Sequence, residues 1–436
     1  MPVADSIERI FEMVKQSALI HKTGGGTGFN FSDLRPGGTL VDSTQGTASG
    51  PVSFMRAFDV VTDVIKQGGV RRGANIGILN ITHPDIMEFI DCKRDGKSFS
   101  NFNISIGLHS NFLEQVKNDE MVQLHFWGSP FREKIKARVL FDRLCENAWR
   151  NGEPGVLFLD NINKANPVPF LGRIFATNPC GEAPLLSFES CNLGSINLSA
   201  FVVDGKINYE RLEEVVNIAT RFLDDMIDVN KYPRIQIARK TRLTRKVGLG
   251  VMGWADMLGK LGIMYNTPEA RELAEKLMKF IHETAHKQST LLGKEKGYCF
   301  AKLKRRNTCV TTIAPTGTLS ILADCSSSIE PHFARSYTKN VINGQKLQFD
   351  VPWKTVTSIE IAPEDHIKMQ AAFQKYVDQG VSKTINLPNS ATIEDIAQGI
   401  MLGHELGCKG MTFYRQDTRE APLQALSECV GDKCLI

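Results

Sequence analysis

Apolar residues recur at helical spacing in several long stretches of the chain. Apolar side chains three or four positions apart line one face of a helix, so each stretch predicts an amphipathic helix. The predicted helices span residues 5–20, 51–67, 135–150, 209–229, 268–287 and 393–406. Shorter apolar runs predict strands at 76–81, 101–107, 156–159 and 310–313. Strands that alternate with helices favour an α/β fold.

Composition places the chain among ordinary globular proteins. It has 436 residues, 42% of them hydrophobic and 23% charged, with a net charge of +4. The length suggests two or three domains, although barrels run longer as single units. A charge this small predicts no nucleic-acid partner, while anionic small substrates stay possible. No apolar run approaches the ~18 residues of a membrane span, and the start lacks a signal-peptide core, so we expect no membrane contact and a cytoplasmic location.

The ten cysteines are scattered along the chain without any C-x-x-C pair. This spacing argues against a disulfide scaffold and against a structural zinc site, so we expect no metal ligands. Cys429 and Cys434 form a close pair just before the end. A chain end is mobile unless it is tied down, so a dithiol there is well placed to carry electrons. The alternative is two incidental cysteines.

The stretch 178–182 is the most chemically loaded in the chain. Asn178, Cys180 and Glu182 alternate there with Pro179 and Gly181, and Cys191 follows soon after. In an extended segment these three side chains would share one face, which would aim an amide, a thiol and a carboxyl at one point. A second thiol nearby could supply electrons. The alternative is a buried cysteine in an apolar strand.

Three other stretches are weaker candidates for ligand contacts. The run 314–321, rich in Thr and Ser, follows a predicted strand and could hold an anion at a helix start, or be an ordinary N-cap. The glycine run 23–29 does not satisfy G-x-G-x-x-G, so a flexible turn and backbone close to a ligand are equally compatible with it. Arg71 and Arg72 lie between glycines, as a cationic ligand loop or a solvated turn.

Together these stretches resemble the catalytic subunit of ribonucleotide reductase, and its adenosylcobalamin-dependent (class II) form most of all. The resemblance runs from Pro2 to Ile436. Nine motifs in the family's order carry it: GGGTGF at 24–29, GGVRRGAN at 68–75, HPDI at 83–86, TNPCGE at 177–182, ESCNLGSINL at 189–198, GLGVMGWAD at 248–256, PTGTLS at 315–320, SSSIEP at 326–331 and SKTINLP at 382–388.

The resemblance implies a ten-stranded α/β barrel over residues 1–415, with a central finger loop that carries Cys180, and a flexible redox tail over 416–436. It implies that Cys180 becomes the thiyl radical that abstracts the 3′ hydrogen of the substrate. Glu182 would accept the 3′-hydroxyl proton, and Asn178 would hydrogen-bond the substrate. Cys191 would be one of two thiols that form a disulfide as the 2′-hydroxyl leaves as water.

The remaining sites follow from the same resemblance. The substrate, a ribonucleoside di- or triphosphate, would be bound by Pro315, Thr316, Gly317, Thr318 and Ser320, with Gly25 and Gly26. A deoxynucleotide effector would act through a loop with Gly69, Arg71 and Arg72. Cys429 and Cys434 would re-reduce the active-site disulfide, and a thioredoxin- or glutaredoxin-type protein would reduce them in turn. The family also implies a homodimer.

One position bears on how the radical arises. Class I subunits receive it from a partner through two adjacent tyrosines, and here Tyr414 is followed by Arg415. The broken pair favours a local source, adenosylcobalamin. The tail also lacks the RVxGY-like segment of a glycyl-radical (class III) reductase. The D-x-H-x-x-G cobalamin motif is absent, which counts neither way because class II reductases are not expected to use it.

The start of the chain departs from the family pattern. The family has a second redox cysteine a few residues ahead of the stretch that corresponds to Pro2-Val3-Ala4-Asp5-Ser6, and here that place falls before Met1. The expectation is therefore the larger part of a split, intein-interrupted or truncated reductase, which needs an N-terminal fragment to supply this thiol. Two alternatives remain: a class I large subunit with a radical-generating partner, and a nucleotide-binding fragment without turnover.

Overall fold

The computed structural model describes residues 1–41, 45–67, 71–126, 132–300, 302–340, 346–418 and 423–425. A six-stranded sheet has the order β1-β6-β7-β10-β20-β19. Its strands are β1 (Thr27–Asn30), β6 (Asn75–Asn80), β7 (Phe102–Leu108), β10 (Gly155–Phe158), β20 (Gly410–Arg415) and β19 (Thr384–Leu387). The predicted strands at 76–81, 101–107 and 156–159 are therefore confirmed within a residue or two.

The strand ladder consists of two parallel parts that meet at one antiparallel junction. Strands β1, β6, β7 and β10 are parallel, β10 and β20 are antiparallel, and β20 and β19 are parallel again. Val381, just before β19, bridges to Ile313, and Thr311 bridges to Leu249. Leu249 lies in β16 (Val247–Met252), which pairs in parallel with β13 (Asn192–Asn197).

The run 310–313, predicted as a strand, contributes only isolated bridges. Part of its backbone is engaged elsewhere, because Val310 N and Thr311 N donate to the Asp378 carboxylate at 2.7 and 3.2 Å. A side chain has therefore replaced the neighbouring strand as the hydrogen-bond partner of these groups. The mixed α/β architecture is nevertheless as predicted.

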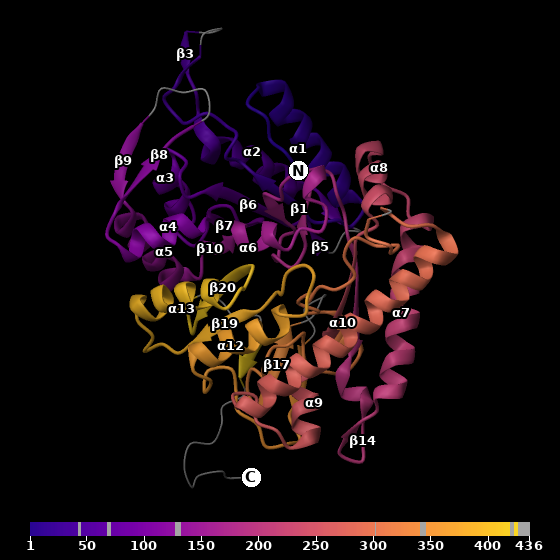
Figure 1. Ribbon diagram of the computed structural model, residues 1–436. Coiled ribbons are helices and arrows are strands. Elements are labelled where there is room, and N and C mark those ends of the chain that lie inside the picture. Colours follow the sequence, from indigo (N-terminus) through magenta and orange to yellow (C-terminus); the bar gives the residue numbers. More distant parts are fainter. Residues whose placement is uncertain are drawn as a thin grey trace.

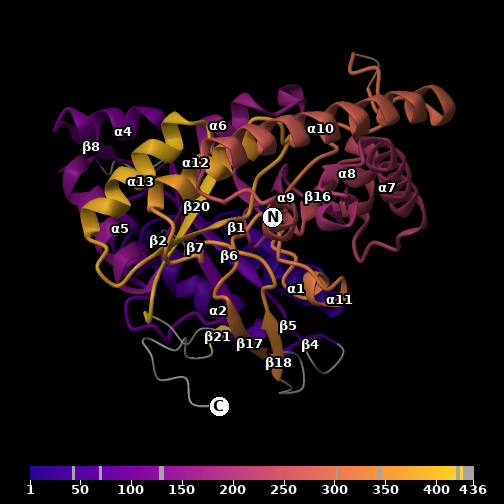
Figure 2. The same cartoon turned by 90° about the horizontal axis from the view of Figure 1, so that it is seen from below.

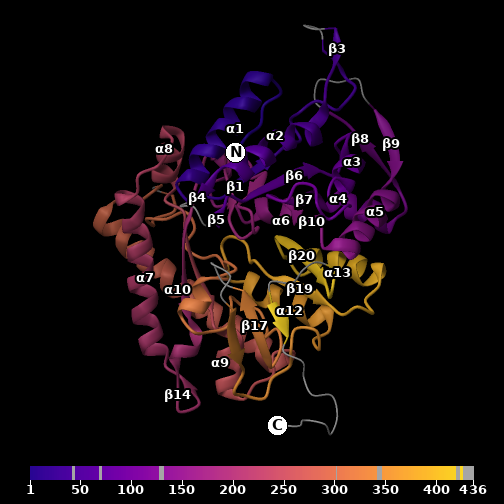
Figure 3. The same cartoon turned by 180° about the vertical axis from the view of Figure 1, so that it is seen from behind.

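Helices cover the strands on the outside (Figures 1 and 3). They are α1 (Ile7–Lys22), α2 (Gly50–Val64), α3 (Ile86–Asp91), α4 (Ser110–Lys117), α5 (Ala137–Asn151), α6 (Leu159–Lys164), α7 (Tyr209–Val229), α8 (Ile235–Thr244), α9 (Trp254–Leu261), α10 (Pro268–Lys296), α11 (Leu319–Leu322), α12 (Pro363–Gln374) and α13 (Ile393–Glu405). Figure 2 shows α10, α12 and α13 following one another along one side, and neighbours in the series α7, α10, α12, α13, α5 are in contact. None of the helices described is long and apolar enough to cross a membrane.

All six predicted helices are present. Helix α7 has the predicted bounds, and the Thr392 side chain caps α13 in a capping box with Asp395. Helix α10 continues well past residue 287, because Ser289 and Leu292 extend its buried face. Two large apolar cores result, one around β6, β7 and β10 and one around β13 and β16.

Short hairpins and one small sheet are separate from the six-stranded sheet. They are β2 (Leu40–Val41) with β3 (Gly46–Thr47), β4 (Lys66–Gln67) with β5 (Arg71–Arg72), β8 (Met121–Leu124) with β9 (Glu133–Lys136), β11 (Ala176–Thr177) with β12 (Pro184–Leu185), β14 (Val202–Val203) with β15 (Lys206–Ile207), and β17 (Ser336–Asn340) between β18 (Lys346–Asp350) and β21 (Leu423–Ala425). The hairpin of β11 and β12 carries the stretch with Cys180.

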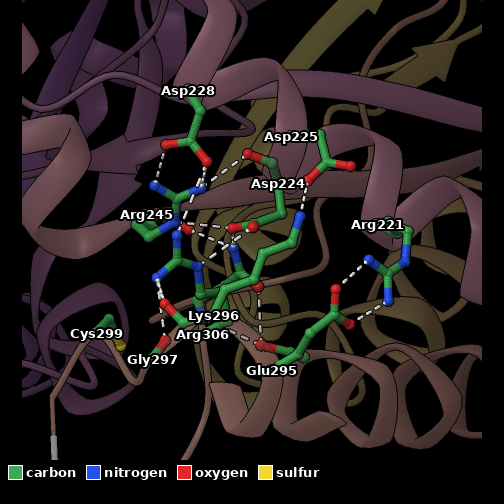
Figure 4. A network of polar contacts seen from close by, with 12 residues as sticks. Arg221, Asp224, Asp225, Asp228, Arg245, Glu295, Lys296, Gly297, Cys299 and Arg306 are labelled. Atoms are coloured by element: carbon green, nitrogen blue, oxygen red, sulfur yellow. Dashed lines mark hydrogen bonds and ion pairs between the residues drawn. The ribbon is translucent and has the colours of Figure 1, made fainter. Parts of the chain in front are cut away.

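A network of buried charges fixes the start of β16 (Figure 4). Arg245 donates to Asp224 Oδ1 at 2.8 Å and to Asp228 Oδ1 at 2.7 Å. Arg306 Nε and Asn307 Nδ2 also donate to the Asp224 carboxylate, at 3.3 and 2.8 Å. Asp224 is fully buried, so its charge depends on these donors. The network ties α7 to the residues that lead into β16.

We expect Asp224→Ala to lower the free energy of unfolding by about 3–5 kcal/mol, because it leaves the buried Arg245 guanidinium with fewer hydrogen-bond acceptors. Arg221→Ala is the matched control, since it removes the solvent-exposed pair with Glu295 and should cost about 0–1 kcal/mol. Urea denaturation of both variants measures the difference. Equal losses would contradict the assigned role of the network.

Candidate active site

The residues 178–182 form a tight turn, named here the Cys180 turn. Gly181 N donates to Asn178 O at 3.0 Å, and Gly181 has a φ of +82°. The expectation of an extended segment with three side chains on one face is therefore wrong. Gly181 adopts the left-handed conformation and reverses the chain between β11 and β12. As a result Cys180 is exposed, whereas Glu182 is only 2% exposed.

Close backbone contacts hold the Cys180 turn in place. A Cβ atom at Gly28 would lie 1.8 Å from Thr177 O, and one at Gly380 would lie 2.6 Å from Gly181 O. Gly26 faces the ring of Pro179, where a Cβ would lie 2.8 Å from Pro179 Cγ. The glycine run near residue 25 is thus needed, at least in part, for this packing.

Hydrogen bonds reach the Cys180 turn from both parts of the strand ladder. Asn103 on β7 donates its Nδ2 to Pro179 O at 2.8 Å. Gly380 N, next to Val381 in the other part, donates to Glu182 O at 2.7 Å. Thr312 Oγ1 donates to the same Glu182 carbonyl. The turn is therefore held between the two parallel parts of the ladder.

Glu182 is a buried acid. Burial raises its pKa, although the Asn178 side chain opposes this shift. Its Oε2 has no hydrogen-bond partner among the described residues. A carboxyl group with a raised pKa holds a proton more readily than an ordinary carboxyl group does, which suits it to accept and return a proton during a reaction.

Two cavities flank the Cys180 turn, and Pro179 lines both. The Cys191 cavity has a volume of about 670 Å³ and is lined by Asn178, Cys191, Gly25 and Gly26, among others. The Cys180 cavity has about 450 Å³ and is lined by Cys180, Pro315, Lys383 and Tyr414, among others. Several predicted site residues therefore lie around one turn but line different cavities. Asn178, Cys191, Gly25 and Gly26 line one cavity, and Cys180 and Pro315 line the other.

Cys191 lies just before β13 and is half-buried. Its Sγ lies 3.5 Å from Gln379 Nε2, which donates to it, and 3.5 Å from Asn192 O. Burial raises the pKa of Cys191 to about 12, and Gln379 and Lys246 lower it in part. Cys191 is therefore a protonated thiol at neutral pH, and it can give up a proton together with an electron.

The predicted phosphate-binding stretch forms a loop before the short helix α11. Pro315 lines the Cys180 cavity. Thr316 has a φ of +53°, and its Oγ1 accepts from Ser328 N at 2.8 Å. Ser320 Oγ lies 2.7 Å from Ser327 Oγ. Thr318 is the N-cap residue of α11, as the alternative of an ordinary N-cap expects, but its side chain makes no capping hydrogen bond among the described residues.

Of the other predicted residues, two lie in a short strand and three lie outside the residues that the structure describes. Arg71 and Arg72 form β5, which pairs with β4. Gly69, Cys429 and Cys434 lie outside the described residues. Within the range 416–436, assigned to the tail, β21 pairs with β17.

Arg415 follows Tyr414 at the end of β20. Its guanidinium lies 4.0 Å from the centre of the Trp149 ring, and its Nε donates to Trp149 O at 3.1 Å. Tyr414 lines the Cys180 cavity. Tyr414 is therefore followed by a cation that is stacked on Trp149.

The start of the chain contributes to the Cys191 cavity. The Met1 ammonium donates to Gly28 O, and Pro2 bridges to Asn30 beside β1. Both residues line this cavity. Burial lowers the pKa of the Met1 amino group to about 5.

Three side chains offer possible metal ligands within 4.8 Å of one another, namely His282, His286 and Asp378. Arg305 donates to His286 Nδ1 at 2.9 Å, so the ring proton is on Nε2, which lies 3.0 Å from Asp378 Oδ2. A metal on Nε2 would displace this proton and leave two donors facing each other at Nδ1. Hydrogen bonding therefore accounts for the cluster without an ion.

Sequence reasoning missed several residues that shape the site. Asn103 was a polar position within an apolar strand, which was a usable signal. Lys246 is buried against Glu189, with its Nζ 2.8 Å from Oε2. Lys246 and Glu189 are far apart in the sequence, so no local pattern predicted that they pair. Gln379 lay just ahead of the SKTINLP motif without any signal of its own.

We expect Glu182→Gln to become more stable relative to the unaltered chain as the pH rises above 4.5, the ordinary pKa of this carboxyl. The raised pKa means that the unfolded state binds fewer protons than the folded state above that pH, so ionisation of Glu182 costs the fold stability. Thermal melts at several pH values measure this, with the exposed Glu214→Gln as control. A difference that does not change with pH would contradict the burial argument.

Known proteins share both the sequence and the fold. The sequence profile "Ribonucleotide reductase, barrel domain" matches residues 1–305, 301–356 and 345–414. The vitamin B12-dependent ribonucleoside-diphosphate reductase of Thermoplasma acidophilum is 51% identical, over 96% of this chain and 61% of that protein. The protein of the same name from Mycobacterium tuberculosis (strain H37Rv) is 42% identical, over 96% of this chain and 66% of its own length.

A solved structure agrees. The Actinobacillus ureae class Id ribonucleotide reductase alpha subunit superposes with a TM-score of 0.78 at 25% identity, over 95% of this chain and 83% of that one. The chain thus spans about three fifths of the length of the Thermoplasma relative. On these matches, the chain belongs to the ribonucleotide reductase barrel-domain family.

Proposed function

We propose that the chain is the catalytic barrel of an adenosylcobalamin-dependent ribonucleotide reductase, which makes 2′-deoxyribonucleotides for DNA synthesis in the cytoplasm. The observation that carries the proposal is the Cys180 turn, which is held between the two parts of the ladder with Glu182 and Cys191 close by. Such a placement supports the finger loop of a ten-stranded barrel. The names of the relatives at 51% and 42% identity support the cobalamin-dependent form.

The Cys180 cavity fits the nucleoside end of such a cofactor. Its lining includes Asn103, Ser105 and Asn386, whose amides and hydroxyl can hydrogen-bond a sugar and a base. Cys180 is exposed at its wall, so its sulfur can be reached from this side. The chemistry that adenosylcobalamin supplies when bound is the removal of a hydrogen atom from a thiol. The stacked Arg415, in place of a second tyrosine, favours this local source over a relay from a partner.

The chain's own residues then act on the ribose. The Cys180 thiyl radical takes the 3′ hydrogen atom, and Glu182 accepts the 3′-hydroxyl proton. Asn178 orients the sugar by hydrogen bonding. Cys191 and a second thiol together give two electrons and two protons, so the 2′-hydroxyl leaves as water and a disulfide forms. Cys180 finally returns its hydrogen atom to C3′ and Glu182 returns its proton to the 3′ oxygen, which regenerates the thiyl radical and the carboxylate.

The second thiol is proposed to come from an N-terminal fragment or segment at the wall of the Cys191 cavity. Met1 and Pro2 lie at this wall, so a thiol placed there would share the cavity with Cys191. Cys429 and Cys434 are proposed to reduce the resulting disulfide, and a thioredoxin- or glutaredoxin-type protein to reduce them in turn. These roles need residues beyond the described ones.

The substrate is proposed to be a ribonucleoside di- or triphosphate. Its phosphates would be bound by the loop from Pro315 to Ser320, which is braced by Ser327 and Ser328. Gly25 and Gly26 would approach it from the Cys191 cavity. A deoxynucleotide effector would act through the loop that contains Gly69, Arg71 and Arg72.

A homodimer is proposed from the outer face of α7. Ile218, Phe222 and Val229 lie on this face and are 61%, 61% and 70% exposed. They recur at helical spacing, which gives an apolar stripe that a second copy of the same helix can cover. The neighbouring Ile235 on α8 is also exposed.

We expect Cys180→Ser to abolish the conversion of ribonucleotides to deoxyribonucleotides, because an alcohol does not replace a thiol as the hydrogen-atom carrier. The assay contains the chain, the added N-terminal segment, adenosylcobalamin and a dithiol, and the product is quantified by chromatography. Cys92→Ser is the control, since it lines neither cavity. Turnover only with a radical-generating metalloprotein would assign the chain to class I, and nucleotide binding without any turnover would leave a binding fragment.

We expect Phe222→Glu to shift the chain from dimer to monomer, because a carboxylate in the apolar stripe is desolvated on association. Analytical ultracentrifugation at several concentrations measures the shift. Leu347→Glu, at an exposed position far from α7, is the control. A variant that dimerises like the unaltered chain would remove α7 from the interface.

A further inference from the structure

Cys191 has a neighbour that the proposed reaction does not use. Gln379 Nε2 lies 3.5 Å from Cys191 Sγ and 3.1 Å from Val247 O. The next residue, Gly380, donates its N–H to Glu182 O at 2.7 Å. One short segment between α12 and β19 therefore contacts both the half-buried thiol and the Cys180 turn.

The surroundings of Gln379 decide which end of its amide faces the sulfur. Val247 O can only accept a hydrogen bond, so the NH₂ end must point toward it, and the same NH₂ group lies beside Cys191 Sγ. An amide turned the other way would set two carbonyl oxygens against each other. The sulfur therefore receives an N–H rather than a lone pair.

The backbone of Gln379 is fixed as firmly as its side chain. Its N–H donates to Thr311 O at 3.1 Å, and its carbonyl accepts from Lys409 Nζ at 2.6 Å and from Gln374 Nε2 at 2.8 Å. The residue is 3% exposed. The Gln379 amide is thus held in place before it donates to Cys191. An exposed glutamine would lose side-chain freedom on forming the same hydrogen bond.

An N–H aimed at sulfur matters when the sulfur carries negative charge. A disulfide is reduced when an incoming thiolate forms a bond to one sulfur and the S–S bond breaks, which leaves its electron pair on the other sulfur. If Cys191 is the leaving sulfur, it departs as a thiolate and then takes a proton from water. A more stable leaving thiolate departs faster.

We propose that Gln379 is a positioning residue for Cys191, and that its N–H fixes the thiol toward the cavity and stabilises the thiolate that is released when the Cys191 disulfide is reduced. The disulfide belongs to the proposed function, whereas the contact with the sulfur does not depend on it. Lys246, buried nearby against Glu189, also lowers the pKa of Cys191, whereas Cys309 and Glu189 raise it.

The test follows the Cys191 thiol directly, in the full chain and without substrate. Alkylation by iodoacetamide is measured between about pH 7 and pH 10, where the thiolate is the reacting form, and peptide mass spectrometry separates Cys191 from the other cysteines. Gln379→Met removes the donor at similar volume, and should slow alkylation of Cys191 by about three- to tenfold at each pH. Gln379→Glu should slow it further, because a carboxylate repels the thiolate.

Gln370→Met is the matched control. Gln370 is also buried on α12 and donates to Gly410 O at 2.8 Å, but it has no contact with Cys191. The proposal is overturned if Gln379→Met reacts like the unaltered chain, or if Gln370→Met slows alkylation as much. Thermal melts verify folding, and Gln379→Glu decides alone if the Met variant does not fold. Because alkylation needs no turnover, an inactive reductase would leave this result intact.

Discussion

The Cys180 turn brings peptide groups into the interior of the protein, where each buried polar group without a partner costs about 1–3 kcal/mol. The rest of the site is arranged to supply those partners. Asn103, Thr312 and Gly380 bond the turn's carbonyls, and Gly28 and Gly380 lack the side chains that would block its approach. The segment that carries Cys180 is thereby held by backbone packing and by hydrogen bonds to its carbonyls.

Buried charges position the strands around this turn. Lys246 pairs with Glu189, and its Nζ also donates to Pro184 O at 3.2 Å, which joins β16 to the hairpin that carries Cys180. Arg245, one residue earlier, is fixed by Asp224 and Asp228. Such pairs contribute little net stability but are costly to break, so they select one arrangement of the strands.

Local pattern predicted the helices well, because an amphipathic helix is defined by residues three and four apart. Helices α7 and α13 are examples. The shape of the Cys180 turn was not predicted, since the alternation of polar residues in 178–182 suits a strand until Gly181 takes a left-handed conformation. The predicted strand at 310–313 forms only isolated bridges, and the reason is different. Its backbone donors bind Asp378, which lies far along the chain.

The candidate site was also predicted only in part. The motif TNPCGE indicated Asn178, Cys180 and Glu182 as candidates, because it places an amide, a thiol and a carboxyl group within five residues. Lys246 and Gln379 act through long-range contacts, and a single sequence contains no measure of such distances. The glycines at 26 and 28 were visible but ambiguous, since only the packing against Pro179 and Thr177 explains why a side chain is excluded there.

Pro179 lines both cavities, so the two sites share a wall. A molecule in either cavity would border the same ring, so a displacement of the ring by one molecule would change the free energy of filling the other cavity. Thermodynamic linkage makes that effect equal in both directions. Because Pro179 belongs to the hairpin of β11 and β12, such an effect would need no domain movement.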